Sequence, residues 1–224
     1  SQVTLVNGTV KDTYGGGLGE ETYVTDSVDV TVGNENTTSL KVSGSVYGGS
    51  AYGTVNASSR TNNVSNYDTT VTVNAGEIGN VFGGGKGDNS ITPYVTGNVS
   101  VTTNGGTIKN LFGGNDASGE PNGEVVAYLN GGTIESAYGG GNNTLVSNTT
   151  VYQNNASVTN LYGGSNQSGN VDTADIYVSG GTTTNLYGGN NSGGTTTDTH
   201  IEMNSGIVTT MYGGGRATDT DASQ

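Results

Sequence analysis

The sequence predicts an all-β fold: a parallel β-helix, or β-solenoid, of about eight coils of roughly 25–35 residues, right-handed and three-sided. Three observations lead to this prediction. An aromatic residue followed by Gly-Gly recurs along the chain, short alternating segments precede it, and Gly, Asn, Ser and Thr dominate a composition with 41 Gly and only 30% hydrophobic residues. The eight recurring aromatic residues are Tyr14, Tyr47, Phe82, Phe112, Tyr138, Tyr162, Tyr187 and Tyr212.

Each repeat contains the same succession of strand and turn signals. Residues 104–114 read NGGTIKNLFGG and residues 130–140 read NGGTIESAYGG. Alternating β-branched residues before the first Gly pair favour a short strand, and Gly-Gly permits the positive φ of a tight turn. A second strand carries Thr-Ile, and a bend at the following Asn is required because Ile and Leu three residues apart cannot share one face of a straight strand. A third strand is expected to begin at the Leu-aromatic pair.

The common offset from the turn predicts which residues stack. We expect the first strands to form one parallel sheet, with coils about 4.8 Å apart. The stacked segments are residues 99–103, 125–129, 151–153, 176–178 and 201–203. Their inward rows are Val71 and Val73, Val101 and Thr103, Ala127 and Leu129, Ile176 and Val178, and Ile201 and Met203. In the second strand, Ile134 is expected to point inward and Glu135 to point into water.

Asparagine recurs at two positions of the repeat, where stacked side chains can hydrogen-bond to one another. The position before the Gly pair holds Asn74, Asn104, Asn130, Asn154 and Asn204. The position at the bend holds Asn80, Asn110, Asn160 and Asn185. Asn also tolerates the left-handed conformation that bends demand.

Charge and composition narrow the classes of partner. The formal net charge is −13, with 19 acidic residues and six scattered basic ones, so neither nucleic acid nor an anionic membrane surface is an expected partner. Cys is absent, and no apolar run approaches the roughly 18 residues of a membrane span, so no membrane insertion is expected. We expect residues 1–224 to form a single solenoid domain, a fragment of a longer chain, that is monomeric.

The first four coils are longer than the later ones. Their extra residues lie around 17–27, 50–69 and 86–97, mainly after the aromatic-Gly-Gly motif. Insertions in a solenoid tend to gather along one edge, which often binds ligands.

The Gly-Gly-Thr-Ile and aromatic-Gly-Gly-Asn motifs together resemble the Gly/Asn/Thr-rich β-helix repeats of large bacterial surface adhesins and autotransporter passengers. The Asn bend also resembles the Asn ladder of pectate-lyase-type β-helices, in scaffold only. The resemblance implies a secreted or cell-surface bacterial protein, either an adhesin that binds a host or neighbouring-cell glycan or protein side-on, or a rigid spacer. The alternative is a polysaccharide-active β-helix enzyme or a phage tail-spike component.

The candidate ligand-binding residues are Tyr128, Tyr152 and Tyr177, which occupy the same outward position in three consecutive coils. Each Tyr offers a large area and a hydroxyl group at little entropic cost, although ordinary cross-strand stacking explains the same row. The aromatic residues of aromatic-Gly-Gly are expected to be structural stacks.

No catalytic group is expected, because His200 and Glu202, which share one strand face, are too few for a catalytic constellation. No metal site or cofactor is expected either. The segment 84–88 (GGKGD) departs from the calcium nonapeptide pattern, and the loop carboxylates leave only weak Ca²⁺ binding open.

Overall fold

The computed structural model describes residues 1–61 and 65–217, which contain strands and no helix. The strands are β1 (Gln2–Leu5), β2 (Gly8–Val10), β3 (Thr13–Tyr14), β4 (Tyr23–Val24), β5 (Val28–Val32), β6 (Leu40–Tyr47), β7 (Thr54–Val55), β8 (Thr69–Val73), β9 (Glu77–Phe82), β10 (Tyr94–Val95), β11 (Val99–Phe112), β12 (Val125–Tyr138), β13 (Val146–Gln153), β14 (Ser157–Tyr162), β15 (Val171–Tyr187) and β16 (Thr196–Tyr212).

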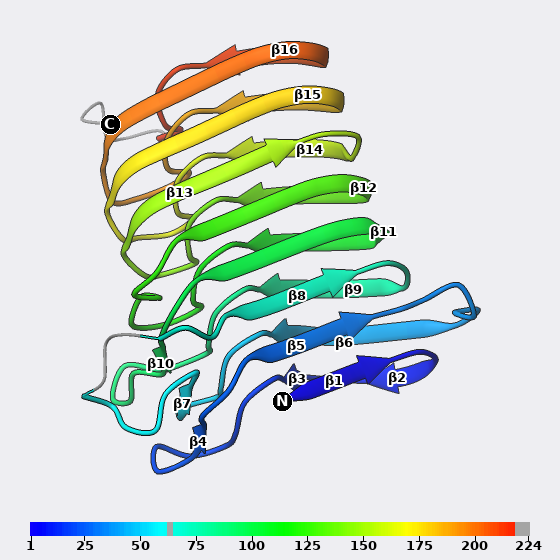
Figure 1. Cartoon of the computed structure of the whole chain (residues 1–224). Coiled ribbons are helices and arrows are strands. Elements are labelled where there is room, and N and C mark those ends of the chain that lie inside the picture. Colours follow the sequence, from blue (N-terminus) through cyan, green and yellow to red (C-terminus); the bar gives the residue numbers. More distant parts are fainter. Residues whose placement is uncertain (62–64, 218–224) are drawn as a thin grey trace.

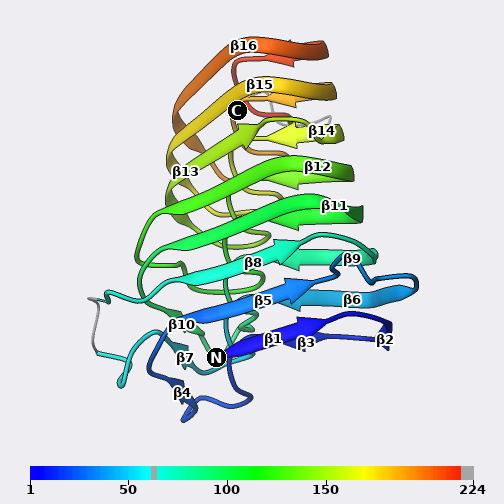
Figure 2. The same ribbon diagram turned by 45° about the vertical axis from the view of Figure 1, so that its right-hand side comes forward.

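The chain winds into a parallel β-solenoid of about eight turns, which confirms the predicted fold class (Figure 1). One side stacks β1, β5, β8, β11, β12, β13, β15 and β16 in that order. The predicted first-strand segments pair in register: Val101 lies beside Ala127, Ala127 beside Val151, and Val151 beside Ile176. β1 and β16 therefore lie at opposite ends of the stack, as two views show (Figures 1 and 2).

In most coils the chain turns back on itself at a glycine, whereas the turn between β13 and β14 is Asn154-Asn155-Ala156. Gly106, Gly132 and Gly206 have positive φ values of 83°, 88° and 95°. After this turn, Ile108 and Leu111 are both buried, as the predicted bend at Asn110 requires. The predicted third strand is not separate, however, because β11 continues without a break through Asn110 to Phe112.

The extra residues of the early coils form an ordered layer on the third side of the solenoid. β4, β7 and β10 pair in parallel as a separate three-stranded sheet, which lies at the N-terminal end of the stack (Figure 2). Arg60 holds this layer together: its guanidinium lies 4.5 Å from the centroid of the Tyr94 ring and donates to the carbonyl oxygens of Glu20, Tyr52 and Thr92. Residues 62–64, within the predicted loop 50–69, lie outside the described residues.

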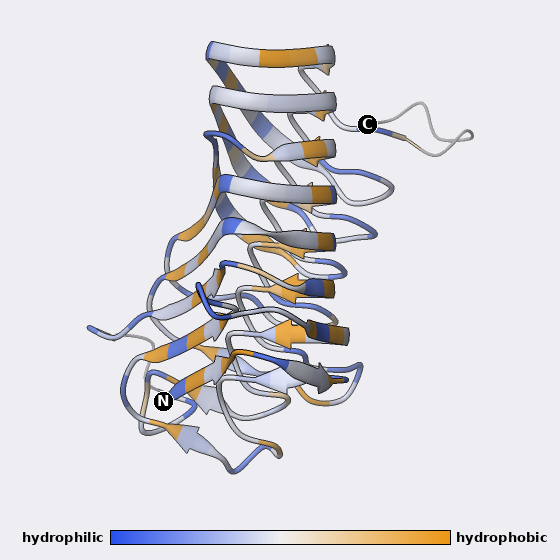
Figure 3. Cartoon of the chain, turned by 90° about the vertical axis from the view of Figure 1, so that its right-hand side faces the viewer, coloured by the Kyte–Doolittle hydropathy of each residue, from blue (hydrophilic) through white to orange (hydrophobic). Residues whose placement is uncertain are grey.

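The interior consists of an aliphatic cluster and a separate aromatic cluster. Leu111 belongs to the aliphatic cluster and Phe112 to the aromatic cluster, because successive strand residues point to opposite sides of the backbone. Hydrophobic residues consequently recur at matching places on successive strands (Figure 3). The predicted inward rows are buried except in the last coil, where Met203 is 43% exposed because β16 has a neighbouring strand on one side only.

The eight aromatic rings form one continuous stack, with centroids 4.5–4.9 Å apart. From Tyr47 to Tyr162 these rings are buried, at 1–5% exposure. The structural interpretation of the aromatic-Gly-Gly residues is confirmed, and burial raises the pKa of the Tyr138 phenol to about 12. The five buried rings serve the packing between coils.

The asparagine ladders form where they were predicted, except that Asn204 donates to Glu202 at 2.7 Å instead of joining the first ladder. Asn104 donates to Asn74, Asn130 to Asn104 and Asn154 to Asn130, at 2.8–3.2 Å. At the bend, Asn110 donates to Asn80 at 2.9 Å and Asn185 to Asn160 at 3.0 Å. A third ladder was not predicted: four residues after successive aromatic residues, it joins Asp116, Asn142, Asn166 and Asn191.

Gln153 is an exception in the apolar interior, where it stacks between Leu129 and Val178. It is fully buried; its Nε2 donates to the carbonyl oxygen of Ala156 at 2.7 Å, whereas its Oε1 has no hydrogen-bond partner. The Ala156 carbonyl also accepts from the backbone N–H of Thr182, so it does not depend on Gln153 alone.

We expect Gln153→Leu to stabilise the protein. Leu removes the unsatisfied Gln153 Oε1, and a buried polar atom without a partner costs about 1–3 kcal/mol. Leu also removes the hydrogen bond to the Ala156 carbonyl, which contributes about 1 kcal/mol. A net gain of about 1 kcal/mol corresponds to a rise in Tm of about 2–4 °C. Gln153→Glu, which keeps the shape and buries a charge, should lower Tm sharply. Calorimetry of both variants checks the expectation, and a lower Tm for Gln153→Leu would contradict it.

Candidate ligand-binding surface

The three candidate tyrosines lie together on the outer side of β12, β13 and β15. Tyr128 pairs in register with Tyr152, and Tyr152 with Tyr177. Their ring centroids are 5.2 and 5.3 Å apart, with interplanar angles of 7° and 17°. The sequence therefore placed these residues correctly relative to one another, and Tyr128 is 37% exposed.

The orientation of the rings differs from a flat platform. Because the rings stack face to face along the solenoid axis, Tyr152 has both faces against its neighbours and presents its edge and hydroxyl group outward. Tyr128 stacks on one side only, since Thr102 occupies the matching position of the preceding coil. Beyond Tyr177 in the row, the His200 ring lies in a T-shaped arrangement with the Tyr177 ring, at a centroid distance of 5.7 Å. Tyr128 has one ring face without an aromatic neighbour.

Charged groups surround the C-terminal end of this row. The Asp175 carboxylate raises the pKa of the Tyr177 phenol, which stays protonated and able to donate a hydrogen bond near neutral pH. Asp175 Oδ1 also lies 3.6 Å from His200 Nδ1. Glu202, which the sequence placed on the same face as His200, accepts a hydrogen bond from Asn204.

Three adjoining depressions connect the Tyr row to the long loop 86–97, and we call them together the side groove. The first, of about 440 Å³, is lined by Tyr128, Tyr152, Glu124 and Asn148, among others. The second, of about 480 Å³, shares Glu124 and Asn148 with it and adds Glu120. The third, of about 280 Å³, shares Glu120 with the second and ends at Tyr94.

The side groove has an aromatic ring at each end and polar groups between them. Tyr94 is 36% exposed and carries Arg60 against its ring. Glu120, Glu124 and Asn148 are exposed between the two aromatic ends. Carboxylate and amide groups of this kind accept and donate hydrogen bonds to ligand hydroxyl groups. The sequence singled out the two ends of the groove, the Tyr row and the loop 86–97, but not the residues between them. The sequence feature that marks this middle part is the turn-forming segment Pro121-Asn122-Gly123 after the fourth repeat.

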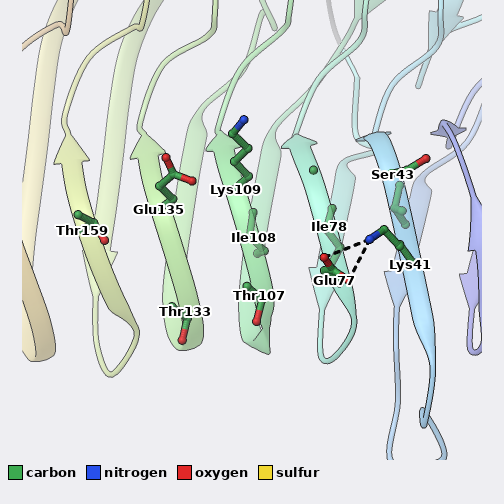
Figure 4. A pocket seen from close by; sticks show the side chains of 12 residues that line it. Lys41, Ser43, Glu77, Ile78, Thr107, Ile108, Lys109, Thr133, Glu135 and Thr159 are labelled. Atoms are coloured by element: carbon green, nitrogen blue, oxygen red, sulfur yellow. Dashed lines mark hydrogen bonds and ion pairs between the residues drawn. The ribbon is translucent and has the colours of Figure 1, made fainter.

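A second groove, of about 400 Å³, lies on the outer face of β6, β9, β11, β12 and β14, and we call it the back groove (Figure 4). Its walls carry an ion pair between Lys41 and Glu77, at 3.2 Å, together with Lys109 and Glu135. Gly79 has no side chain, so it leaves a gap in the outward row between the Lys41–Glu77 pair and Lys109. The back groove has no aromatic lining, and its formal charges balance.

Asp88, at the end of the segment 84–88 compared above with a calcium motif, begins a turn that ends at Ile91. Asp88 Oδ1 accepts hydrogen bonds from the backbone N–H groups of Ser90 and Ile91 at 2.7 and 2.8 Å, and these bonds lower its pKa. Within residues 1–61 and 65–217, no three His, Cys, Asp or Glu residues are grouped so that they could hold a metal ion. The same residues include no helix long and apolar enough to cross a membrane.

No family model, curated protein or solved structure matches the chain. The properties of the two grooves are therefore the basis for a functional assignment.

Proposed function

We propose that this chain is a segment of an extracellular bacterial surface protein, an adhesin or stalk, and that it binds a glycan side-on in the side groove. The observation that carries the proposal is the arrangement of the groove, with the open ring face of Tyr128 at one end, Tyr94 at the other, and carboxylate and amide groups between them. Aromatic surface with a few polar groups is a common composition for a site that recognises a small molecule or a sugar.

The rigidity of the scaffold supports this role. Tyr128 and Tyr152 lie on paired strands of a ladder that continues through eight coils, a distance of roughly 34 Å at about 4.8 Å per interval. Side chains held in place before binding lose little entropy when a ligand arrives, which favours affinity. The same rigidity suits a stalk that holds another domain away from the cell.

The charge of the surface indicates the class of glycan. Glu120 and Glu124 line the groove, and the whole chain has a net charge of −13. Like charges repel, so we expect neutral or amino-sugar glycans to bind in preference to sulfated or uronic-acid glycans. A surface that adsorbed glycans non-specifically would not show this preference.

A glycan array that contains neutral, amino and acidic glycans tests the proposal. For the array hits, we expect the triple variant Tyr128→Thr/Tyr152→Thr/Tyr177→Thr to bind at least about tenfold more weakly, a loss of about 1.4 kcal/mol, because Thr keeps the β-propensity and removes the rings. Tyr94→Thr should weaken binding as well. An unchanged Tm establishes that these variants are folded.

The back groove supplies the matched control. Lys109→Ser/Glu135→Thr alters the opposite surface without changing the net charge, and it should leave glycan binding unchanged. Equal binding by the folded triple variant, by Tyr94→Thr and by the native chain would overturn the side-groove proposal. A failure of the native chain to bind any glycan, with capture of a protein ligand that the triple variant loses, would replace the glycan with a protein partner.

A further inference from the structure

Four asparagines in the chain are followed directly by glycine: Asn7, Asn104, Asn122 and Asn130. An Asn-Gly pair is able to modify itself, because glycine has no side chain to hinder attack by its backbone nitrogen on the Cγ atom of the asparagine. The attack closes a five-membered ring. It requires a glycine N–H group that is not already hydrogen-bonded and a backbone that lets the two atoms meet. The structure separates one of the four pairs from the other three.

Three of these pairs are part of the hydrogen-bonded ladders of the solenoid. The N–H group of Gly8 donates to the carbonyl oxygen of Ser39 at 2.7 Å. Asn7 Oδ1 in turn accepts a hydrogen bond from the N–H group of Ser39 at 2.9 Å. Asn104 and Asn130 lie within the continuous strands β11 and β12, and Asn130 Nδ2 donates to Asn104 Oδ1 at 3.2 Å. Ring closure at these three asparagines would have to disrupt the ladders.

The fourth pair, Asn122-Gly123, lies in the loop between β11 and β12. Asn122 is exposed, and the N–H group of Gly123 has no hydrogen-bond partner among the residues that the structure describes. Asn122 Oδ1 accepts a hydrogen bond from the N–H group of Gly97 at 2.9 Å. Negative charge develops on this oxygen when the Cγ atom is attacked, so the Gly97 N–H group is placed to stabilise the transition state.

The chemistry of the pair needs water as its only further reactant. The Gly123 nitrogen forms a bond to Asn122 Cγ, the bond from Cγ to Nδ2 breaks, and the side-chain nitrogen leaves as ammonia with the proton of the Gly123 amide. Water then opens the succinimide ring at either of its two carbonyl groups, which leaves aspartate or isoaspartate in place of the asparagine. The chain thereby gains one negative charge.

The position of this pair connects the reaction to the side groove. Asn122 lines the second and third depressions of the groove, together with Glu120, and Glu124 lines the first and second. We propose that Asn122 deamidates spontaneously in the folded protein, so that the side groove gains a third carboxylate as the protein ages. The reaction itself does not depend on the proposed function, whereas its effect on glycan selectivity rests on it.

Incubation of the folded chain at mildly alkaline pH, with digestion and mass spectrometry at intervals, measures the reaction at each asparagine. We expect Asn122 to be lost at least about tenfold faster than any of the other three Asn-Gly asparagines. In a urea-unfolded chain the four pairs should react at similar rates, because the ladders that protect three of them are gone. A folded chain in which Asn122 reacts no faster than the other three would overturn the proposal.

Asn122→Gln is the matched variant, because its longer side chain would have to close a six-membered ring, which is slower. This variant should keep the Tm of the native chain and should lose the fast formation of acidic species on ion exchange. Asn130→Gln, which changes an exposed ladder residue, should leave that fast reaction unchanged. Equally fast acidification of the folded Asn122→Gln chain would place the reaction elsewhere and contradict the assignment.

Asn122→Asp reports the effect on the groove without the reaction. On the glycan array, we expect the ratio of amino-sugar to neutral-glycan binding to rise above that of the native chain, because a third carboxylate attracts ammonium groups. An unchanged ratio in the folded variant would overturn the connection to the groove but not the deamidation. A native chain that bound no glycan would overturn the proposed function and this connection with it, while the mass-spectrometric result would stand.

Discussion

Ile134→Asp is expected to unfold the protein or to lower its free energy of unfolding by several kcal/mol, whereas Glu135→Lys leaves Tm almost unchanged. Ile134 is 0% exposed and stacks between Ile108 and Val158 in the aliphatic cluster. A carboxylate at that position has no cationic partner, and an unpaired buried charge costs about 3–5 kcal/mol. Glu135 is exposed on the same strand, where substitutions change stability by about 0.5 kcal/mol or less.

Thermal and denaturant unfolding of the two variants measure this contrast. Ile134→Val, which keeps an apolar side chain like that of the neighbouring Val158, is the control and should cost about 0.5–1.5 kcal/mol. Similar losses of stability for Ile134→Asp and Glu135→Lys would show that the assigned facing of this strand is wrong.

The second large effect is expected at Gly139. A Cβ atom there would lie well under 3.0 Å from the carbonyl oxygen of Gly163 and 3.1 Å from a methyl carbon of Val151. Neither the backbone nor the buried Val can withdraw, so Gly139→Ala must push two coils apart. Overpacking of this kind costs on the order of 1–3 kcal/mol or more.

Gly213→Ala supplies the matched control, because this residue occupies the same place in the last coil with nothing within 4 Å. Its effect on Tm should be close to zero. If Gly139→Ala were tolerated as well as Gly213→Ala, the close approach of successive coils at the glycine row would be contradicted.

The repeat made the fold predictable from the sequence. A common offset from the turn before the second strand predicted the stacking of Val101, Ala127 and Val151, and the three-residue separation of Ile108 from Leu111 predicted a bend. Both follow from the period-two alternation of strands, which eight repeats of one pattern made visible. The burial of the aromatic stack followed from the same logic.

The candidate site was less predictable, because it depends on contacts between residues that do not repeat. Tyr128 and Tyr152 could be aligned from the sequence, and cross-strand stacking was one of the two interpretations of their row. The sequence did not decide between that stacking, which the structure shows, and a flat platform. The middle of the side groove could not be found, since Glu120 comes close to Asn148 of β13 through the fold of the loop between β11 and β12. The burial of Gln153 could not be predicted either, because its polar side chain occupies a position where the repeat pattern predicts Leu or Val.

The in-register stacking of the coils underlies both the Tyr row and the side groove, and one cross-linking measurement tests it most directly. Thr72 and Thr102 are register partners in adjacent coils of a chain without Cys, so Thr72→Cys/Thr102→Cys should oxidise rapidly to an intramolecular disulfide. Thr72→Cys/Tyr128→Cys, whose residues are two coil intervals or roughly 10 Å apart, should not. Efficient bridging of the second pair and none of the first would contradict the parallel solenoid described for this chain.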